Sequence, residues 1–374
     1  MSKKIGIGFV GAGWMGASLL RKLHARDDVE IRALVGRTPE KAHAILDELG
    51  LAQELYTDDY DAMLSDPAID AVFLCSVNGA HGPQSIKALE ADKHVFCEKP
   101  CATKYTDYLR QIELEQQRPH LITFVDYLLN FDTMETQLKQ RIADGELGQI
   151  TQIQVNYRHP INISGDKTWK LSADLMGDAI GMGIIHSLSV MINLMAAQAK
   201  PISVYARSQG AQVRPFEPDA IWNIMIGFDN GATGFCAGNI DTANGYDAHH
   251  NIVGTEGAFI FDSLLDRPQK IRMWSNKTTD GKWVYPLDMA RCEAEGVTPW
   301  PEDTTTPDSG DVMNHQTAEC VAHFIECVKA GTPSPLSFAN SAHIAEIGWA
   351  ALISTQIDRP VKLPLNASHA TQVL

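Results

Sequence analysis

Residues 4–26 read KIGIGFVGAGWMGASLLRKLHAR, and this stretch decides the fold. Its apolar run, residues 5–10, predicts a short buried strand, and the apolar spacing from residue 14 onward predicts a helix. Between the two, three glycines have the spacing GxGxxG. A strand, a glycine turn and a helix in this order are typical of the first βα unit of a dinucleotide-binding domain.

Each glycine of this turn has its own physical task. In such units the first makes the tight turn, the second lets the backbone approach a pyrophosphate, and the third allows the helix to pack closely on the strand. The N-terminus of the helix stabilises negative charge. We therefore predict a dinucleotide site at Gly11, Gly13, Trp14, Met15 and Gly16. A glycine-rich turn without a ligand is the alternative.

The end of the second predicted strand bears on the choice of cofactor. About 20 residues after the glycine turn, an NAD-selective domain places an acid that accepts hydrogen bonds from the ribose hydroxyls. Here the strand ends in Gly36, Arg37 and Thr38. A guanidinium can pair with a 2′-phosphate, which an acid would repel. We therefore expect Arg37 and Thr38 to contact the cofactor and favour NADP(H), with NAD(H) as the alternative. The other interpretation of Arg37 is a solvated loop residue without a ligand.

The alternation of elements predicts two domains. Strands and helices alternate up to about residue 121, which is typical of a parallel, doubly wound sheet. Further along, long alternating strands dominate, at residues 150–158, 201–209, 219–231, 232–240 and 249–262. The expected fold is an α/β Rossmann domain over residues 1–125 and an α+β domain, rich in antiparallel strands, over residues 126–374. Residues 276–312 are expected to form a surface excursion or lid.

Composition excludes several classes of partner. The net charge of −15 argues against nucleic acids and anionic membranes, because both need a basic surface. No run reaches the roughly 20 apolar residues of a membrane span. Seven cysteines without a CxxC pair suggest free thiols and a cytoplasmic location. No metal site is expected: His249 and His250 are adjacent on a predicted strand, so their rings point to opposite faces.

The stretch SVNGAHGPQSIKALEADKHVFCEKPCATK, residues 76–104, resembles the Gfo/Idh/MocA family of glucose–fructose oxidoreductase, inositol dehydrogenase and the rhizopine-catabolism protein. Family signatures here are an asparagine turn, a histidine three residues on, and Glu-Lys-Pro. The resemblance continues at residues 138–150, 230–235, 254–259 and 358–364 and so covers nearly the whole chain. It implies that the second domain carries a large, mostly antiparallel open sheet, whose free face often builds dimers or tetramers.

The resemblance also implies roles for the loops that follow two of the strands. Lys99 falls on the family's lysine, which lies near the nicotinamide and the substrate hydroxyl, and the peptide bond before Pro100 is often cis in the family. An ammonium beside an oxidised nicotinamide has its charged form disfavoured, so its pKa falls toward a useful range. Glu98 is expected to contact the cofactor ribose or to position Lys99. The remaining expected cofactor contacts are Ser76, Asn78, His81 and Trp169.

The second candidate is a histidine in an almost wholly apolar run, GDAIGMGIIHSLSVMINLM, residues 177–195. His186 falls on the family's catalytic histidine and is expected to exchange the hydroxyl proton as a general acid/base. A core imidazole with satisfied hydrogen bonds is the alternative. Met182 and Ser189 stand where the family often has aspartates, so the usual orienting carboxylate is absent. Asp178, one turn earlier, is a substitute only if the local turn differs.

The substrate contacts are expected to come from the segment before His186 and from two of the predicted strands. Residues Tyr127, Tyr157, Asp178 and Met182 are the candidates, with Asp126 as a further polar residue that could line the cleft. Inositol-type members often have arginines near residues 129–130, where this chain has leucine and asparagine. Their loss weakens the assignment to inositol.

Together these features predict a cytoplasmic NAD(P)-dependent oxidoreductase, a homodimer or homotetramer. It would act on a secondary hydroxyl or ketone of a sugar, cyclitol or related polyol. Two alternatives remain open. One is a redox-neutral, glycoside-cleaving enzyme of the same family that keeps its cofactor. The other is a non-catalytic nucleotide-binding sensor, for which the two missing aspartates are the main argument.

Overall fold

The structure, a computed structural model, describes residues 4–243, 247–262, 271–286 and 317–373, which fall into two compact units. Unit 1 comprises residues 4–127, 174–177 and 317–342, and unit 2 comprises the other described residues. Each unit has its own sheet and its own buried core.

Unit 1 is built on a six-stranded parallel sheet in the order β3-β2-β1-β4-β5-β6. This is the strand order of a doubly wound dinucleotide-binding domain, so the predicted Rossmann fold is confirmed. The strands are β1 (Ile5–Val10), β2 (Val29–Val35), β3 (Tyr56–Thr57), β4 (Ala71–Leu74), β5 (His94–Cys97) and β6 (Thr123–Val125). The helices are α1 (Trp14–His24), α2 (Pro39–Glu48), α3 (Tyr60–Ser65), α4 (Asn78–Glu90), α5 (Tyr105–Gln117), α7 (Ala173–Met176) and α10 (Thr317–Ala330).

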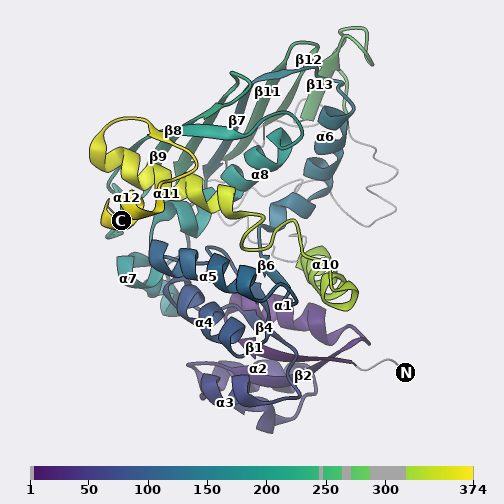
Figure 1. Cartoon of the computed structure of the whole chain (residues 1–374), viewed down its shortest axis with the longest axis vertical. Coiled ribbons are helices and arrows are strands. Elements are labelled where there is room, and N and C mark those ends of the chain that lie inside the picture. Colours follow the sequence, from purple (N-terminus) through teal and green to yellow (C-terminus); the bar gives the residue numbers. More distant parts are fainter. Residues whose placement is uncertain (1–3, 244–246, 263–270, 287–316, 374) are drawn as a thin grey trace. The chain divides into compact units, whose positions relative to one another are not determined.

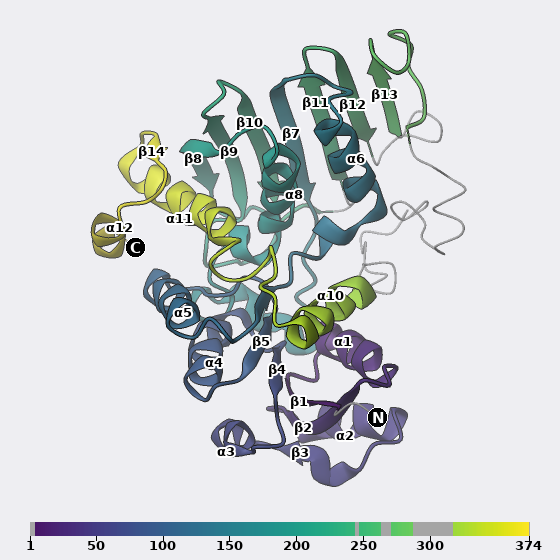
Figure 2. The same cartoon turned by 45° about the vertical axis from the view of Figure 1, so that its right-hand side comes forward.

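A row of phenylalanine rings on β4, β5 and β6 packs against α10 in unit 1. Phe73 on β4 stacks on Phe96 of β5 with 4.5 Å between the ring centroids, and Phe96 stacks on Phe124 of β6 with 4.9 Å between theirs. Phe324 of α10 meets Phe73 edge-on at 5.3 Å. Both views show α10 beside α1 (Figures 1 and 2). A single boundary between residues 125 and 126 is therefore wrong for this part of the chain, because the apolar face of α10 covers this sheet.

Removal of one ring from this cluster tests the assignment. We predict that Phe324→Ala lowers the free energy of unfolding of unit 1 by about 3–5 kcal/mol, because the buried ring leaves a cavity. Chemical denaturation followed by circular dichroism measures the loss. Glu319→Ala, on the exposed side of the same helix, serves as the matched control and should change stability by less than about 0.5 kcal/mol. Equal effects of the two variants would contradict the packing described here.

Unit 2 is built on an eight-stranded sheet in the order β13-β12-β11-β7-β10-β9-β8-β14. Among the described strands of this sheet only β7 and β10 pair in parallel, so the sheet is mostly antiparallel, as expected. Helices α6 and α8 lie on the same face of it (Figures 1 and 2). The strands are β7 (Ile150–Arg158), β8 (Pro201–Gln209), β9 (Ile221–Phe228), β10 (Thr233–Asn239), β11 (Asp247–Gly254), β12 (Gly257–Asp262), β13 (Ile271–Ser275) and β14 (Val361–Lys362). The helices are α6 (Thr133–Ala143), α8 (Ile185–Met195), α11 (Ala342–Ile357) and α12 (Ala367–Val373).

The local turns explain where strand predictions needed correction. Residues 249–262 form two strands instead of one, because the chain turns between β11 and β12. Strand β6 is shorter than its apolar pattern suggests, since a 3₁₀ turn, Leu128–Phe131, follows it. An Asn-Gly turn joins β9 to β10, with Gly231 at φ +86°.

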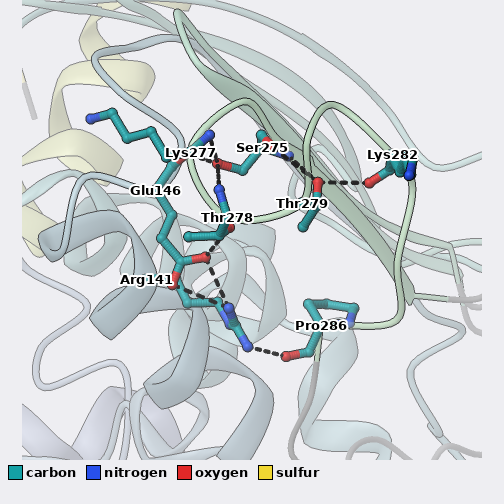
Figure 3. A network of polar contacts seen from close by, with 8 residues as sticks. All are labelled: Arg141, Glu146, Ser275, Lys277, Thr278, Thr279, Lys282 and Pro286. Atoms are coloured by element: carbon teal, nitrogen blue, oxygen red, sulfur yellow. Dashed lines mark hydrogen bonds and ion pairs between the residues drawn. The ribbon is translucent and has the colours of Figure 1, made fainter.

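The described beginning of the expected excursion, residues 276–286, is held by a polar network (Figure 3). Arg141, at the end of α6, donates to the Glu146 carboxylate at 2.9 Å and to the carbonyl oxygen of Pro286 at 2.5 Å. The chain also returns to β13, where the residue pair Met273–Val284 forms a β-bridge. This part of the chain is therefore anchored to α6 and β13. The remainder of the stretch, residues 287–312, lies outside the described residues.

One apolar helical stretch satisfies the length and hydropathy of a membrane span. Residues Ala173–Met195 reach a mean hydropathy of 1.5 over 18 residues, although they contain no uninterrupted run of about 20 apolar residues. Of that window, 72% is buried inside the protein. A helix that packs in a protein core has the same composition, and burial favours that explanation.

Candidate functional site

The glycine turn after β1 leaves open space at the N-terminus of α1. Gly11 has φ +100°, and a Cβ there would lie 2.3 Å from the carbonyl oxygen of Cys75. A Cβ on Gly16 would lie 2.0 Å from the carbonyl oxygen of Gly11. A Cβ on Gly13, in contrast, would meet no atom within 4 Å. Gly11 and Gly16 therefore permit close packing of the turn, whereas Gly13 lines an open space at the N-terminus of α1, which we call the cradle.

This cradle fits the phosphates of a dinucleotide. Gly13 is the N-cap of α1, no side chain caps the helix, and its first turn contains no acidic residue. The backbone amides there are donors whose dipoles favour an anion. Trp14, 52% exposed, and the half-buried Met15 begin the helix. Their contact with a cofactor stays a prediction.

The two residues expected to select the cofactor lie at the end of β2. Both Arg37 and Thr38 are exposed, and Thr38 is the N-cap of α2 without a side-chain capping hydrogen bond. No acid follows β2 before Glu40, in the first turn of that helix. The side chains at this edge can therefore reach a ligand without breaking an observed hydrogen bond of the Thr38 hydroxyl.

Three predicted cofactor contacts after β4 make hydrogen bonds within the protein. The Ser76 hydroxyl donates to the side-chain oxygen of Gln84 at 2.6 Å. The Asn78 amide donates to the carbonyl oxygen of Met176 at 2.9 Å and so holds α7. The buried His81 has ring nitrogens 2.8 Å from the Pro100 carbonyl oxygen and 3.2 Å from that of Ser76. His81 thus ties the loop after β4 to the loop after β5, and any contact of the three with cofactor stays a prediction.

The Glu-Lys-Pro loop directly follows β5. The bond between Lys99 and Pro100 is cis, as the family resemblance implies. Glu98 is buried, and one of its carboxylate oxygens accepts a hydrogen bond from the backbone N–H of Lys99 at 3.1 Å. Burial lowers the pKa of Lys99, while the Glu98 and Asp126 carboxyls oppose that shift. Burial therefore makes the Lys99 ammonium easier to deprotonate than that of a solvated lysine.

His186 lies in unit 2, in the first turn of α8, and is 9% exposed. A π-helical turn, Ile180–Ile184, immediately precedes α8. The ring of Tyr157, on β7, lies 6.2 Å from the His186 ring between centroids. A Cβ on Gly183 would lie 2.5 Å from the Tyr157 ring, so only glycine lets Tyr157 approach this turn. π-Turns of this kind frequently occur at functional sites.

The polar side chains that could orient the His186 ring form hydrogen bonds with nearby backbone groups instead. The Asp178 carboxylate accepts a hydrogen bond from the backbone N–H of Gly181 at 2.8 Å, and burial raises its pKa. It caps the π-turn and does not replace the aspartate of the family. The buried Ser189 hydroxyl donates to the carbonyl oxygen of His186 at 2.8 Å. Met182 lies within the π-turn itself.

The last two candidates, Trp169 and Tyr127, belong to different units. Trp169 is half-buried in a 3₁₀ helix of unit 2, Gly165–Leu171, with the Lys170 ammonium 5.8 Å from its ring centroid. Tyr127 closes unit 1 and is only 1% exposed. Its burial favours a place in the core. Among the described residues no cluster of three or more metal-binding side chains occurs.

The geometry in both units agrees with two family models. One, an oxidoreductase family with an NAD-binding Rossmann fold, matches residues 5–127, and the other, a GFO/IDH/MocA C-terminal domain, matches residues 136–260. The chain belongs to the Gfo/Idh/MocA oxidoreductase family. It is therefore an oxidoreductase with a nicotinamide-dinucleotide domain.

Individual relatives agree with this assignment. The chain is 30% identical to an inositol 2-dehydrogenase of Salmonella paratyphi B over 67% of this chain and 71% of the relative. It is 23% identical to a myo-inositol 2-dehydrogenase of Thermotoga maritima over 96% and 98% of the two chains. Among solved structures, a levoglucosan dehydrogenase in complex with NADH and L-sorbose superposes with a TM-score of 0.80 at 20% identity, covering 97% of this chain and 99% of that one.

Sequence reasoning missed two features of this Gfo/Idh/MocA chain. It assigned no role to Gly183, although a glycine between bulky apolar residues is a signal of close backbone approach. It treated Asp126 as a general polar residue, whereas its carboxyl lies with that of Glu98 in the core of unit 1. The position of Asp126 directly after a buried strand could have indicated this.

The approach of Tyr157 to His186 can be tested through Gly183. We predict that Gly183→Ala destabilises unit 2 by about 1–3 kcal/mol, because the added methyl overlaps the Tyr157 ring. It should also shift the His186 ring resonances in an NMR spectrum. Gly210→Ala is the matched control, because its Cβ would meet its nearest atom, an Asp219 oxygen, at 3.8 Å. Unchanged stability and resonances in Gly183→Ala would show that Tyr157 does not pack as described.

Proposed function

We propose that the chain transfers hydride between a nicotinamide cofactor and a secondary hydroxyl or ketone of a sugar, cyclitol or related polyol. The observation that carries this proposal is the half-buried Lys99 at the carboxyl edge of the parallel sheet. The same edge carries the open cradle at Gly13. Ligands of doubly wound sheets bind at this edge. The names of the inositol dehydrogenase relatives support the substrate class.

The protein groups have separate tasks in this reaction. When bound, the nicotinamide supplies the hydride chemistry. Lys99 binds and polarises the reacting oxygen of the substrate, which is the atom that gains or loses a proton. His186 exchanges that proton, because an imidazole can accept or donate near neutral pH. Glu98 holds the backbone of Lys99 through its hydrogen bond.

The proposed substrate contacts are Tyr157, Met182, Asp178 and Tyr127, and Trp169 is proposed for the cofactor or a sugar ring. Tyr157 has the strongest support, since its ring lies beside that of His186. Met182 shares the π-turn before His186, and Asp178 caps that turn. Trp169 is half-buried and aromatic, as suits contact with a cofactor or sugar ring. Tyr127 is buried in unit 1 and would act through the packing of the loop.

Removal of either proton-handling group tests the proposed chemistry. We predict that Lys99→Met and His186→Asn each lower kcat/KM by about 10²–10⁴ while dinucleotide binding persists, because general acid–base groups contribute factors of this size. Absorbance of the reduced cofactor, with a panel of hexoses, glycosides, uronates and inositols, measures turnover. Full activity in either variant would remove that residue from the mechanism.

The same assay separates the two alternatives. Retained nucleotide with glycoside cleavage but no net reduction would support the redox-neutral reaction. Binding without turnover of any substrate would support the sensor. The dehydrogenase names of the relatives favour net oxidoreduction.

We further propose that NADP(H) is preferred over NAD(H). The exposed Arg37 at the end of β2 and the absence of an acid between β2 and α2 support this choice. We predict that Arg37→Ala weakens NADP⁺ binding by about tenfold, equivalent to roughly 1.4 kcal/mol, with little change for NAD⁺. Isothermal titration with each cofactor measures the ratio, and Arg32→Ala, exposed on the same strand, is the control. An unchanged ratio in Arg37→Ala would favour NAD(H).

The proposal extends to the oligomeric state, the location and the partners of the protein. Strand β9 alternates buried and exposed residues, and Ile202 and Met225 are about half exposed, which suits a homodimer or homotetramer interface on the open sheet. Six described cysteines are buried free thiols, which suits the cytoplasm. The net charge of −15 supports neither nucleic acids nor membranes as partners.

A further inference from the structure

Two buried carboxyl groups lie side by side at the ends of strands β5 and β6. The strands pair in parallel, with Cys97 opposite Val125, so Glu98 and Asp126 are the next residues in register. The backbone N–H of Asp126 continues the pairing by donating to the carbonyl oxygen of Cys97 at 2.9 Å. Glu98 is 6% exposed and Asp126 is fully buried. Lys99 follows Glu98 directly.

The carboxyl oxygens of this pair lack strong donors. Neither oxygen of Asp126, nor one of Glu98, receives a hydrogen bond of ordinary geometry from the described residues, and the neighbour of the Asp126 carboxyl on α10 is the Cys320 thiol, a weak donor. The other Glu98 oxygen accepts the Lys99 backbone N–H. Two ionised carboxylates in a buried position repel one another, and one backbone N–H and a thiol replace only part of the hydration that they lose. One proton held between them removes both penalties, because it turns one acceptor into a donor to the other.

We propose that Glu98 and Asp126 hold one proton between them, so that the pair presents a single negative charge to Lys99. Asp126 is thereby a positioning residue, which acts on Lys99 through Glu98. The inference rests on the proposed function, in which Lys99 touches the substrate oxygen. With two negative charges beside it Lys99 would be fixed as an ammonium, whereas with one it can take both protonation states.

The other titratable groups around the pair are neutral. Burial raises the pKa of the thiols of Cys75, Cys97 and Cys320, which approach the pair from β4, β5 and α10. Burial lowers the pKa of His81 to about 4, so its imidazole carries no charge near pH 7. The charge opposite Lys99 is therefore set by the two carboxyls.

The pKa values of the pair agree with a shared proton. Burial, followed by the neighbouring Asp126, raises the pKa of Glu98 well above its usual range. Burial raises the pKa of Asp126 to about 6. The paired strand ends and the weak donors around the carboxyl oxygens give the physical cause.

The pKa of Lys99 in a double-mutant cycle tests the proposal. The variants are Glu98→Gln, Asp126→Asn and the double variant, and the readout is the pH dependence of Lys99 labelling by an amine reagent, resolved by mass spectrometry. The exposed Lys104 is the internal reference. Each single variant still leaves one negative charge, so the pKa of Lys99 should change by less than about 1 unit. The double variant leaves none, so the pKa should fall by about 1–3 units.

Equal stepwise falls in the two single variants, adding up in the double variant, would mean that both carboxyls are ionised and would overturn the proposal. So would an unchanged pKa of Lys99 in all three variants. With an active substrate, the alkaline limb of the kcat/KM profile should move in the double variant alone. The labelling needs no turnover, so it tests the shared proton even if the proposed reaction fails.

A second measurement applies if the double variant does not fold, as judged by thermal melting and NAD⁺ binding. Infrared spectra of the wild type at neutral pH should contain a carboxylic-acid C=O band that is lost in both single variants. Absence of the band from the wild type, or its persistence in either single variant, would overturn the proposal.

Discussion

Burial of charge at the carboxyl edge of the parallel sheet is the constraint on which the site depends. Parallel strands end at the same edge, so the glycine turn after β1 and the Glu-Lys-Pro loop after β5 belong to one side of unit 1. The phenylalanine row beneath them excludes water from the strands. A carboxyl or ammonium placed there loses hydration, and its charge state is then fixed by its immediate neighbours.

Unit 2 meets a different constraint, because its histidine lies in an apolar helix. The π-turn before α8 places an extra residue in the helical turn, and the absence of a side chain at Gly183 makes room for the Tyr157 ring. The Asp178 carboxylate caps that turn by accepting a hydrogen bond from the Gly181 N–H. The neighbour of the His186 ring is the aromatic ring of Tyr157, whereas the family often has a carboxylate beside this histidine. This chain therefore combines the usual lysine loop with an unusual histidine environment.

The sequence predicted what is local and periodic. The spacing of the glycines predicted a tight turn at Gly11, which has a positive φ in the structure. The alternation of strands and helices predicted the doubly wound sheet. The return of α10 to unit 1 was not predictable, because an amphipathic helix fits any apolar surface and Phe324 does not specify which sheet it covers. The pairing of Glu98 with Asp126 depends on the register of two strands, which neither strand encodes alone.

The most direct test of the account is the fate of a carbinol hydrogen. The wild-type protein would be given NADP⁺ or NAD⁺ together with each of a set of sugars and cyclitols deuterated at their carbinol carbons, and the cofactor would be analysed by mass spectrometry. We predict that one polyol transfers its deuterium to the nicotinamide ring, with ketone formed in equal amount. If the protein is saturated with cofactor and the cofactor gains no deuterium from any of the polyols, the assignment of this chain as a polyol oxidoreductase is contradicted.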